Sequence, residues 1–132
     1  GLFVVYSLIA APELFDARFA HSPALWRDDE ALLKQLDAFL VAHPRLRSQL
    51  FLSLGSDEND KMKAAFIHAR EVLSRQAPPA LAWKAQLTRG GDHGNNAQLA
   101  TPVALRDVYE HWTPTGREPI AGHNVAPAAA TP

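Results

Sequence analysis

Residues 81–96 read LAWKAQLTRGGDHGNN, and this stretch decides the fold class. From Leu81 to Thr88, apolar and more polar side chains alternate with a period of two, which is typical of a strand with one wetter face near a sheet edge. The loop Gly90–Gly94 follows and carries His93. Because a helical segment comes next, the stretch has the form of a unit from a parallel α/β sheet, and it predicts a histidine on the loop beyond a strand.

The rest of the chain repeats this alternation of helix and strand. Apolar side chains recur at i, i+3 and i+4 spacing in Asp28–Ala42 and in Lys61–Arg75, which is the pattern of amphipathic helices. The predicted elements, in chain order, are a helix over Leu2–Ala11, a strand over Arg18–Ser22, a helix over Asp28–Ala42, a strand over Gln49–Leu54, a helix over Lys61–Arg75, the strand Leu81–Thr88 and a helix from Thr101 to about Trp112. We therefore expect an α/β fold with a parallel sheet and helices on both faces.

Local signals suggest where these elements begin and where the domain ends. Asp28 and Asp29 suit a helix start, and Thr101-Pro102 forms an N-cap and first-turn pair. The helix Leu2–Ala11 is apolar nearly all round, so we expect it to be buried between neighbours, including strands that precede Gly1. Residues 1–112 are then the C-terminal portion of a domain, and residues 113–132 are a tail rich in Pro, Ala and Thr.

Composition narrows the range of functions. The chain has a net charge of -1, 47% hydrophobic residues and no cysteine, so neither nucleic-acid binding nor a thiolate site is expected. The apolar run Leu2–Ala11 is about half of the roughly 20 residues that a membrane helix needs. The histidines lack the spacing of zinc ligands, and we expect no metal. Composition does not determine the oligomeric state, nor does it determine whether the protein is cytoplasmic or periplasmic.

Three loops should meet at the carboxyl edge of a parallel sheet, where ligands bind in such folds. His93 can act as a general base near neutral pH, and a carboxylate partner would hold its tautomer. The middle loop offers Asp57, Glu58 and Asp60 for that purpose. An acid followed by a histidine is also the order found in α/β-hydrolases. The three loops are Ser22–Arg27, Gly55–Asp60 and Gly90–Asn96, in which Asn95 and Asn96 are interpreted as turn formers.

Four segments resemble one family in the same order along the chain. Gly1–Leu8 (GLFVVYSL) is similar to the segment just after a Gly-x-Ser-x-Gly-Gly nucleophile elbow, and His21–Trp26 (HSPALW) resembles a Ser-Pro-Ser-Leu-Trp segment. Leu50–Gly55 (LFLSLG) resembles the strand that delivers the catalytic acid, and the loop Gly90–Gly94 resembles the histidine loop. Together they resemble the C-terminal half of an α/β-hydrolase of the esterase D-like family. That family includes enterochelin-type siderophore esterases, S-formylglutathione hydrolases and feruloyl esterases.

The resemblance implies roles for specific residues. His93 matches the catalytic histidine, and Glu58 matches the acid, with Asp57 and then Asp60 as alternatives. The serine would precede Gly1, since Ser22 and Ser56 lack a nucleophile-elbow setting. Trp26 and Ser22 are candidate substrate-binding residues, although Trp26 could equally anchor its loop.

The implied activity is hydrolysis of a small carboxylic ester through an acyl-enzyme, without a cofactor, by the intact protein and not by this chain alone. The alternatives are a peptidase or lactonase of the same fold, or a non-catalytic α/β binding module.

Overall fold

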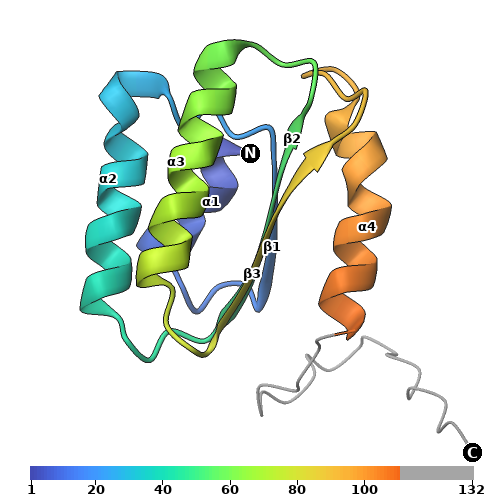
Figure 1. Ribbon diagram of the computed structural model, residues 1–132. Coiled ribbons are helices and arrows are strands. Elements are labelled where there is room, and N and C mark those ends of the chain that lie inside the picture. The colour runs from blue at the N-terminus through green and yellow to red at the C-terminus, as the bar shows by residue number, and fades with distance from the viewer. Residues whose placement is uncertain (111–132) are drawn as a thin grey trace, which may run out of the picture.

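The computed structural model describes residues 1–110, which form one parallel sheet and four helices (Figure 1). The strands are β1 (Ala17–His21), β2 (Ser48–Gly55) and β3 (Leu81–Thr88), in the spatial order β1-β2-β3. Both strand pairs are parallel, and Phe51 of β2 lies opposite Phe19 and Lys84. The predicted α/β class is therefore confirmed. In this sheet β3 lies at an edge, as its alternating sequence predicted.

Helices cover both faces of the sheet, as predicted. Figure 1 shows α1 (Leu2–Ala10), α2 (Arg27–Ala42) and α3 (Asp60–Gln76) on one face and α4 (Asn96–Glu110) on the other. Because every strand is followed by a helix that returns to the opposite end of the sheet, the loops after the three strands share its carboxyl edge. The fold thus brings together the three loops that the sequence singled out.

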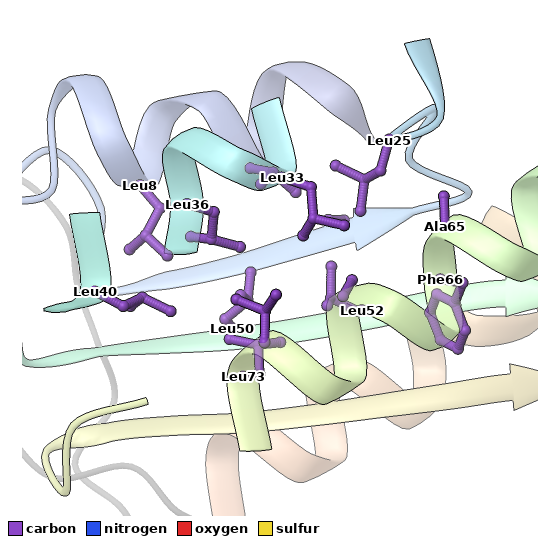
Figure 2. Packing of buried hydrophobic residues seen from close by; sticks show 14 of the residues in the cluster. Leu8, Leu25, Leu33, Leu36, Leu40, Leu50, Leu52, Ala65, Phe66 and Leu73 are labelled. Carbon is purple, nitrogen blue, oxygen red and sulfur yellow. The ribbon is translucent and has the colours of Figure 1, made fainter. Parts of the chain in front are cut away.

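The main hydrophobic core lies between the sheet and the layer formed by α1, α2 and α3. Leu50 and Leu52 of β2 are each at most 2% exposed and point into this layer (Figure 2). Full burial of a leucine side chain contributes about 2 kcal/mol. On the opposite face Phe51 packs edge-on against Phe19, with ring centroids 6.4 Å apart. Because β2 is buried on both faces, it is the rigid centre from which the middle loop projects. The helix side chains of the same core that Figure 2 labels include Leu8, Leu33, Leu36 and Leu73.

A buried arginine ties α1 to the sheet. Arg18 of β1 is 3% exposed, and its guanidinium donates to the backbone oxygens of Ala11 and Phe15 at 2.9 and 2.8 Å. It also donates to the hydroxyls of Ser7 and Ser48 at 3.0 and 2.9 Å. The bond to Ala11 satisfies a carbonyl at the end of α1, where a helix leaves its last carbonyls unpaired. Burial lowers the pKa of the Arg18 guanidinium, and nearby carboxylates oppose that shift.

The predicted start of the last helix is wrong. The structure begins α4 at Asn96, so Pro102 lies inside the helix rather than in its first turn. Thr101 does not cap the helix but donates its hydroxyl back to the carbonyl of Ala97 at 2.6 Å. The start is set instead by the loop, where the backbone oxygen of Asp92 accepts from the Asn96 amide at 2.9 Å.

One further expectation, about the start of α2, needs correction. Asp28, Asp29 and Glu30 all have positive φ values, between 50° and 58°, so regular helix geometry in α2 begins only after them. Their carboxylates therefore belong to a left-handed turn rather than to a regular first helical turn. Within residues 1–110, α1 contacts β1 and α2, and Phe3 on its other side is 69% exposed. The expectation that strands preceding Gly1 cover that side stays a prediction.

Two more predictions concern the ends and the membrane. The tail 113–132 and the domain end at 112 lie outside the described residues. Among the helices that the structure describes, none has the length and apolar character needed to cross a bilayer.

Candidate active site

The three loops at the carboxyl edge of the sheet enclose one cleft of ≈ 620 Å³. The loop after β1 contributes an aromatic and a cationic side chain, the loop after β2 contributes carboxylates, and the loop after β3 contributes the histidine. This convergence is what the parallel topology predicted. The lining residues are Ala24, Trp26, Arg27, Asp57, Glu58, Asn59, Met62, Asp92, His93 and Gly94.

A buried carboxylate and an exposed imidazole form the centre of this cleft. Glu58 Oε2 lies 3.2 Å from His93 Nδ1, and the side chain of Glu58 is only 1% exposed while that of His93 is 72% exposed. With Nδ1 directed at the carboxylate, Nε2 is left for another partner, and no hydrogen bond among residues 1–110 occupies it. This is the arrangement by which a carboxylate fixes the tautomer of a catalytic histidine.

Two glycines allow the acid loop and the histidine loop to meet. A Cβ on Gly55 would lie 2.1 Å from the backbone oxygen of Gly91, so only glycine fits at the end of β2. The contact is reinforced by hydrogen bonds of 2.9 Å from Asp57 N to Gly91 O and from Ser56 N to Thr88 O. The separation between Glu58 and His93 is therefore set by backbone packing.

The histidine loop is held by its own polar side chains. Asp92 Oδ1 accepts from the backbone amides of Gly94 and Asn95 at 2.8 and 3.0 Å, and Asn95 Oδ1 accepts from the Asp92 amide at 2.8 Å. This reciprocal pattern is a helix-capping arrangement, which explains why α4 starts so close to His93. The interpretation of Asn95 as a turn former agrees with this geometry.

The structure separates the three candidate acids. Asp57 is exposed and its carboxylate accepts from the Ser56 hydroxyl at 2.9 Å, while Asp60 is exposed at the first position of α3. Only Glu58 is both buried and within hydrogen-bond distance of His93 among the described carboxylates. The geometry thus favours the first choice made from the resemblance.

The residues predicted to bind substrate occupy different positions. Trp26 lines the cleft, is 40% exposed, and has the ammonium of Lys61 5.8 Å from its ring centroid. Ser22 is only 8% exposed, and its hydroxyl donates to Glu58 Oε1 at 2.5 Å. Since that hydroxyl already donates its proton to the buried Glu58 carboxylate, the prediction that Ser22 contacts substrate gains no support from the structure.

Asn96 belongs to the site, although the sequence interpretation treated it as a turn former. It is fully buried, and its Nδ2 donates to the hydroxyls of Ser22 and Ser53 at 2.8 and 3.1 Å. The signal that could have revealed it is periodicity, since Asn96 begins the buried i+4 stripe of α4. That stripe continues through Ala100, Ala104 and Val108. A helix assumed to start at Thr101 hides this pattern.

A second branch of the same network leads to His21. Its Nδ1 lies 2.7 Å from the Ser53 hydroxyl, and its Nε2 lies 3.2 Å from the Thr101 hydroxyl. Because Ser53 accepts from Asn96 and Thr101 donates to a backbone carbonyl, the consistent assignment is a neutral imidazole protonated at Nε2. Burial lowers the pKa of His21.

The N-terminus of α1 lies at the same edge of the sheet. A Cβ on Gly1 would be 2.3 Å from the backbone oxygen of His21 and 2.7 Å from the Cα of Pro23. The backbone of Gly1 is therefore packed against the β1–α2 loop. The positive end of the α1 dipole also lies at this edge.

In the described part of the chain, no group of three His, Cys, Asp or Glu side chains could hold a metal ion.

Comparison with known proteins gives matches among solved structures. No family model matches the chain, and no curated protein matches it. The BES protein from Bacillus cereus is similar with a TM-score of 0.66 and 22% identity, over 79% of this chain and 40% of that protein. The siderophore hydrolase EstB from Aspergillus nidulans is similar with a TM-score of 0.61 and 22% identity, over 90% and 48% of the two chains. Siderophore hydrolase EstA from the same organism gives 0.52 and 23%, over 83% and 43%.

These similarities confirm the fold that the resemblance implied. The chain spans less than half the length of each of these three structures.

Proposed function

We propose that this chain carries the acid and the histidine of a serine ester hydrolase whose nucleophile lies on the segment preceding Gly1. We refer to the chain together with that segment as the full-length protein. The observation that carries the proposal is the pairing of buried Glu58 with exposed His93 at 3.2 Å, on loops that share the cleft with Trp26. His93 is the general base, and Glu58 is the acid that orients it.

The position of α1 supports a nucleophile from the preceding segment. Gly1 packs against the β1–α2 loop at the carboxyl edge of the sheet, so residues just before it lie at the same edge as His93. In α/β-hydrolases the serine occupies a turn that leads directly into a helix, and the first helical amide helps to bind the oxyanion. The N-terminus of α1 offers that environment for the negative charge that develops on the substrate oxygen.

The proposed reaction has two halves. The serine oxygen attacks the ester carbonyl carbon while its proton moves to His93 Nε2, and Glu58 stabilises the resulting imidazolium. When the tetrahedral intermediate collapses, the bond to the alcohol oxygen breaks and the alcohol leaves with the proton from His93. Water then attacks the acyl carbon and passes a proton to His93. When this second intermediate collapses, the bond to the serine oxygen breaks, the serine takes the proton back from His93, and the carboxylic acid is released. The likeness to siderophore hydrolases makes siderophore esters a substrate class to test first.

A nucleophile from within the described residues finds less support. Ser22 donates its proton to Glu58 rather than to His93, and it is 8% exposed. Ser53 is fully buried and its hydroxyl contacts His21 and Asn96. Neither hydroxyl has the geometry for proton transfer to an accessible imidazole.

The test is hydrolysis of p-nitrophenyl acetate by the full-length protein. We expect His93→Ala to reduce kcat by about 10³-fold or more, because the general base is lost. His43→Ala is the matched control, since His43 is exposed at the end of α2, at the opposite end of the sheet. Unchanged activity of His93→Ala would refute the assignment.

The same assay tests which residue is the acid and where the nucleophile lies. Glu58→Gln should lower kcat far more than Asp57→Asn, because only Glu58 faces the imidazole. The chain 1–132 alone should show no turnover. Turnover by that chain that disappeared in Ser22→Ala would place the nucleophile inside it instead.

A substrate panel separates the remaining alternatives. Turnover of amides or lactones in preference to simple and siderophore esters would identify a peptidase or a lactonase with the same machinery. Absence of any turnover, together with a preceding segment that lacks a serine elbow, would identify a binding module.

A further inference from the structure

The carboxylate of Glu58 is held asymmetrically. Its Oε1 accepts from the Ser22 hydroxyl at 2.5 Å and from the Gly55 amide at 2.9 Å, whereas its Oε2 faces His93. A carboxylate that is 1% exposed needs such partners, because an unpaired buried charge is costly. The two donors occupy one oxygen and leave the other for the imidazole.

The proton of Ser22 has a defined direction. A hydroxyl has one proton to donate, and the Ser22 oxygen already accepts from Asn96 Nδ2 at 2.8 Å. The proton is therefore directed at Glu58, the only acceptor within reach among the described residues. The backbone amide of Ser22 also donates to the Ser53 carbonyl at 2.8 Å and holds the residue at a φ of 46°. Such left-handed geometry is unfavourable for serine and persists only where its surroundings enforce it.

Asn96 fixes the direction of the Ser22 hydroxyl proton from the face of the sheet that α4 covers (Figure 1). It is the first residue of α4, and its second Nδ2 proton goes to Ser53, so both of its donors are committed. Its Oδ1 is buried and has no partner among residues 1–110. The amide thus acts here as a donor to both hydroxyls, and it links the start of α4 to the acid through one serine.

We propose that Ser22 and Asn96 are positioning residues that hold Glu58 with Oε2 toward His93. The two hydrogen bonds that do this, from Asn96 to Ser22 and from Ser22 to Glu58, are called the Glu58–Ser22–Asn96 relay. This inference rests on the proposed function and extends it to two residues that do not contact the substrate. It also assigns a role to the strained backbone of Ser22, which the mechanism itself does not use.

Removing one donor should affect turnover more than binding. In the full-length protein, Ser22→Ala is expected to lower kcat about 10-fold with little change in KM, the size of effect expected for a hydrogen bond to a charged group. Asn96→Asp keeps the volume but replaces both donors by acceptors, and it should cause a similar loss. Ser48→Ala is the matched control, because Ser48 is an equally buried serine at the opposite end of the sheet. Its kcat should stay within about 2-fold of the parent.

A double-mutant cycle separates positioning from general damage to the fold. If Ser22 acts through Glu58, then Ser22→Ala introduced into Glu58→Gln should lower kcat by less than about 2-fold. A second readout is the ¹⁵N chemical shifts of His93, which report the tautomer: Ser22→Ala should raise the population protonated at Nε2.

The outcomes are distinct. An equal 10-fold loss in both backgrounds, or an unchanged tautomer population in Ser22→Ala, would overturn the relay. A loss in Ser48→Ala as large as in Ser22→Ala would also overturn it, because stability alone would then explain both effects. Full activity of Glu58→Gln and of His93→Ala would instead overturn the proposed function, and the relay with it.

Discussion

Replacing Gly55 by alanine should uncouple the acid from the histidine without touching either side chain. The added Cβ would lie 2.1 Å from Gly91 O and 2.3 Å from Gly91 C, and both are backbone atoms that no rotamer change can move aside. Restoring an ordinary contact of 3.4 Å requires the two loops to separate by about 1.3 Å. Because His93 is two residues beyond Gly91, it moves with that loop.

The consequence for the site follows from the distances. The Glu58–His93 pair is at 3.2 Å, so a displacement of even about 0.5 Å takes it outside hydrogen-bond range. A misplacement of about 1 Å in a catalytic group commonly costs about 100-fold in rate. We therefore expect Gly55→Ala to lower kcat/KM about 100-fold, and the overpacking to lower the free energy of unfolding by about 1–3 kcal/mol.

The assay is ester hydrolysis by the full-length protein, combined with urea unfolding. Gly94→Ala is the matched control on the histidine loop, since its Cβ would meet only Asp92 Oδ1 at 3.3 Å and no backbone atom. That variant should keep its activity within a few-fold, in line with an effect below about 1 kcal/mol. If Gly55→Ala retained at least half of the parental kcat/KM, the close approach of the loops would not be what positions His93, and the reasoning would be refuted.

Two further predictions concern stability. Arg18→Met removes a buried guanidinium that binds the Ala11 carbonyl at the end of α1 and the Phe15 carbonyl beyond it, so several acceptors lose their partner. Urea denaturation should show that the free energy of unfolding falls by about 3 kcal/mol or more, and a fall below about 1 kcal/mol would contradict this role. Burial lowers the pKa of His21 from 6.5, so the unfolded chain binds its proton more readily than the folded chain. Stability should therefore fall as the pH drops below about 6.5, with a smaller fall in His21→Gln; equal slopes in the two proteins would show that His21 is not responsible.

The order of helices and strands could be predicted because its signals are local. Side-chain periodicity within each segment is enough to distinguish the alternating strand Leu81–Thr88 from the amphipathic helix Asp60–Gln76. Alternation of the two then predicts a parallel sheet, and a parallel sheet places the loops after its strands at one edge. The loop with His93 and the loop with Glu58 are therefore predicted to lie close together at that edge.

Boundaries were less predictable, because the chain offers competing signals there. Thr101-Pro102 has the form of a helix start, yet Asp92 and Asn95 already cap the chain and start α4 at Asn96. Proline is tolerated inside α4 at the cost of one hydrogen bond, and the buried stripe of small side chains compensates through packing against the sheet. The error hid Asn96, whose burial becomes apparent only once the helix starts in the right place.

The sequence by itself determined the fold class, the edge of the sheet at which chemistry is expected, and the histidine that it presents. Only the tertiary structure decided that Glu58, rather than its neighbour Asp57, faces His93, and that Ser22 and Asn96 support it. The physical reason is that adjacent residues in a turn point in different directions, which depend on how closely two backbones approach. That approach is set by Gly55 against Gly91, a contact between segments 36 residues apart in the chain that no local pattern encodes.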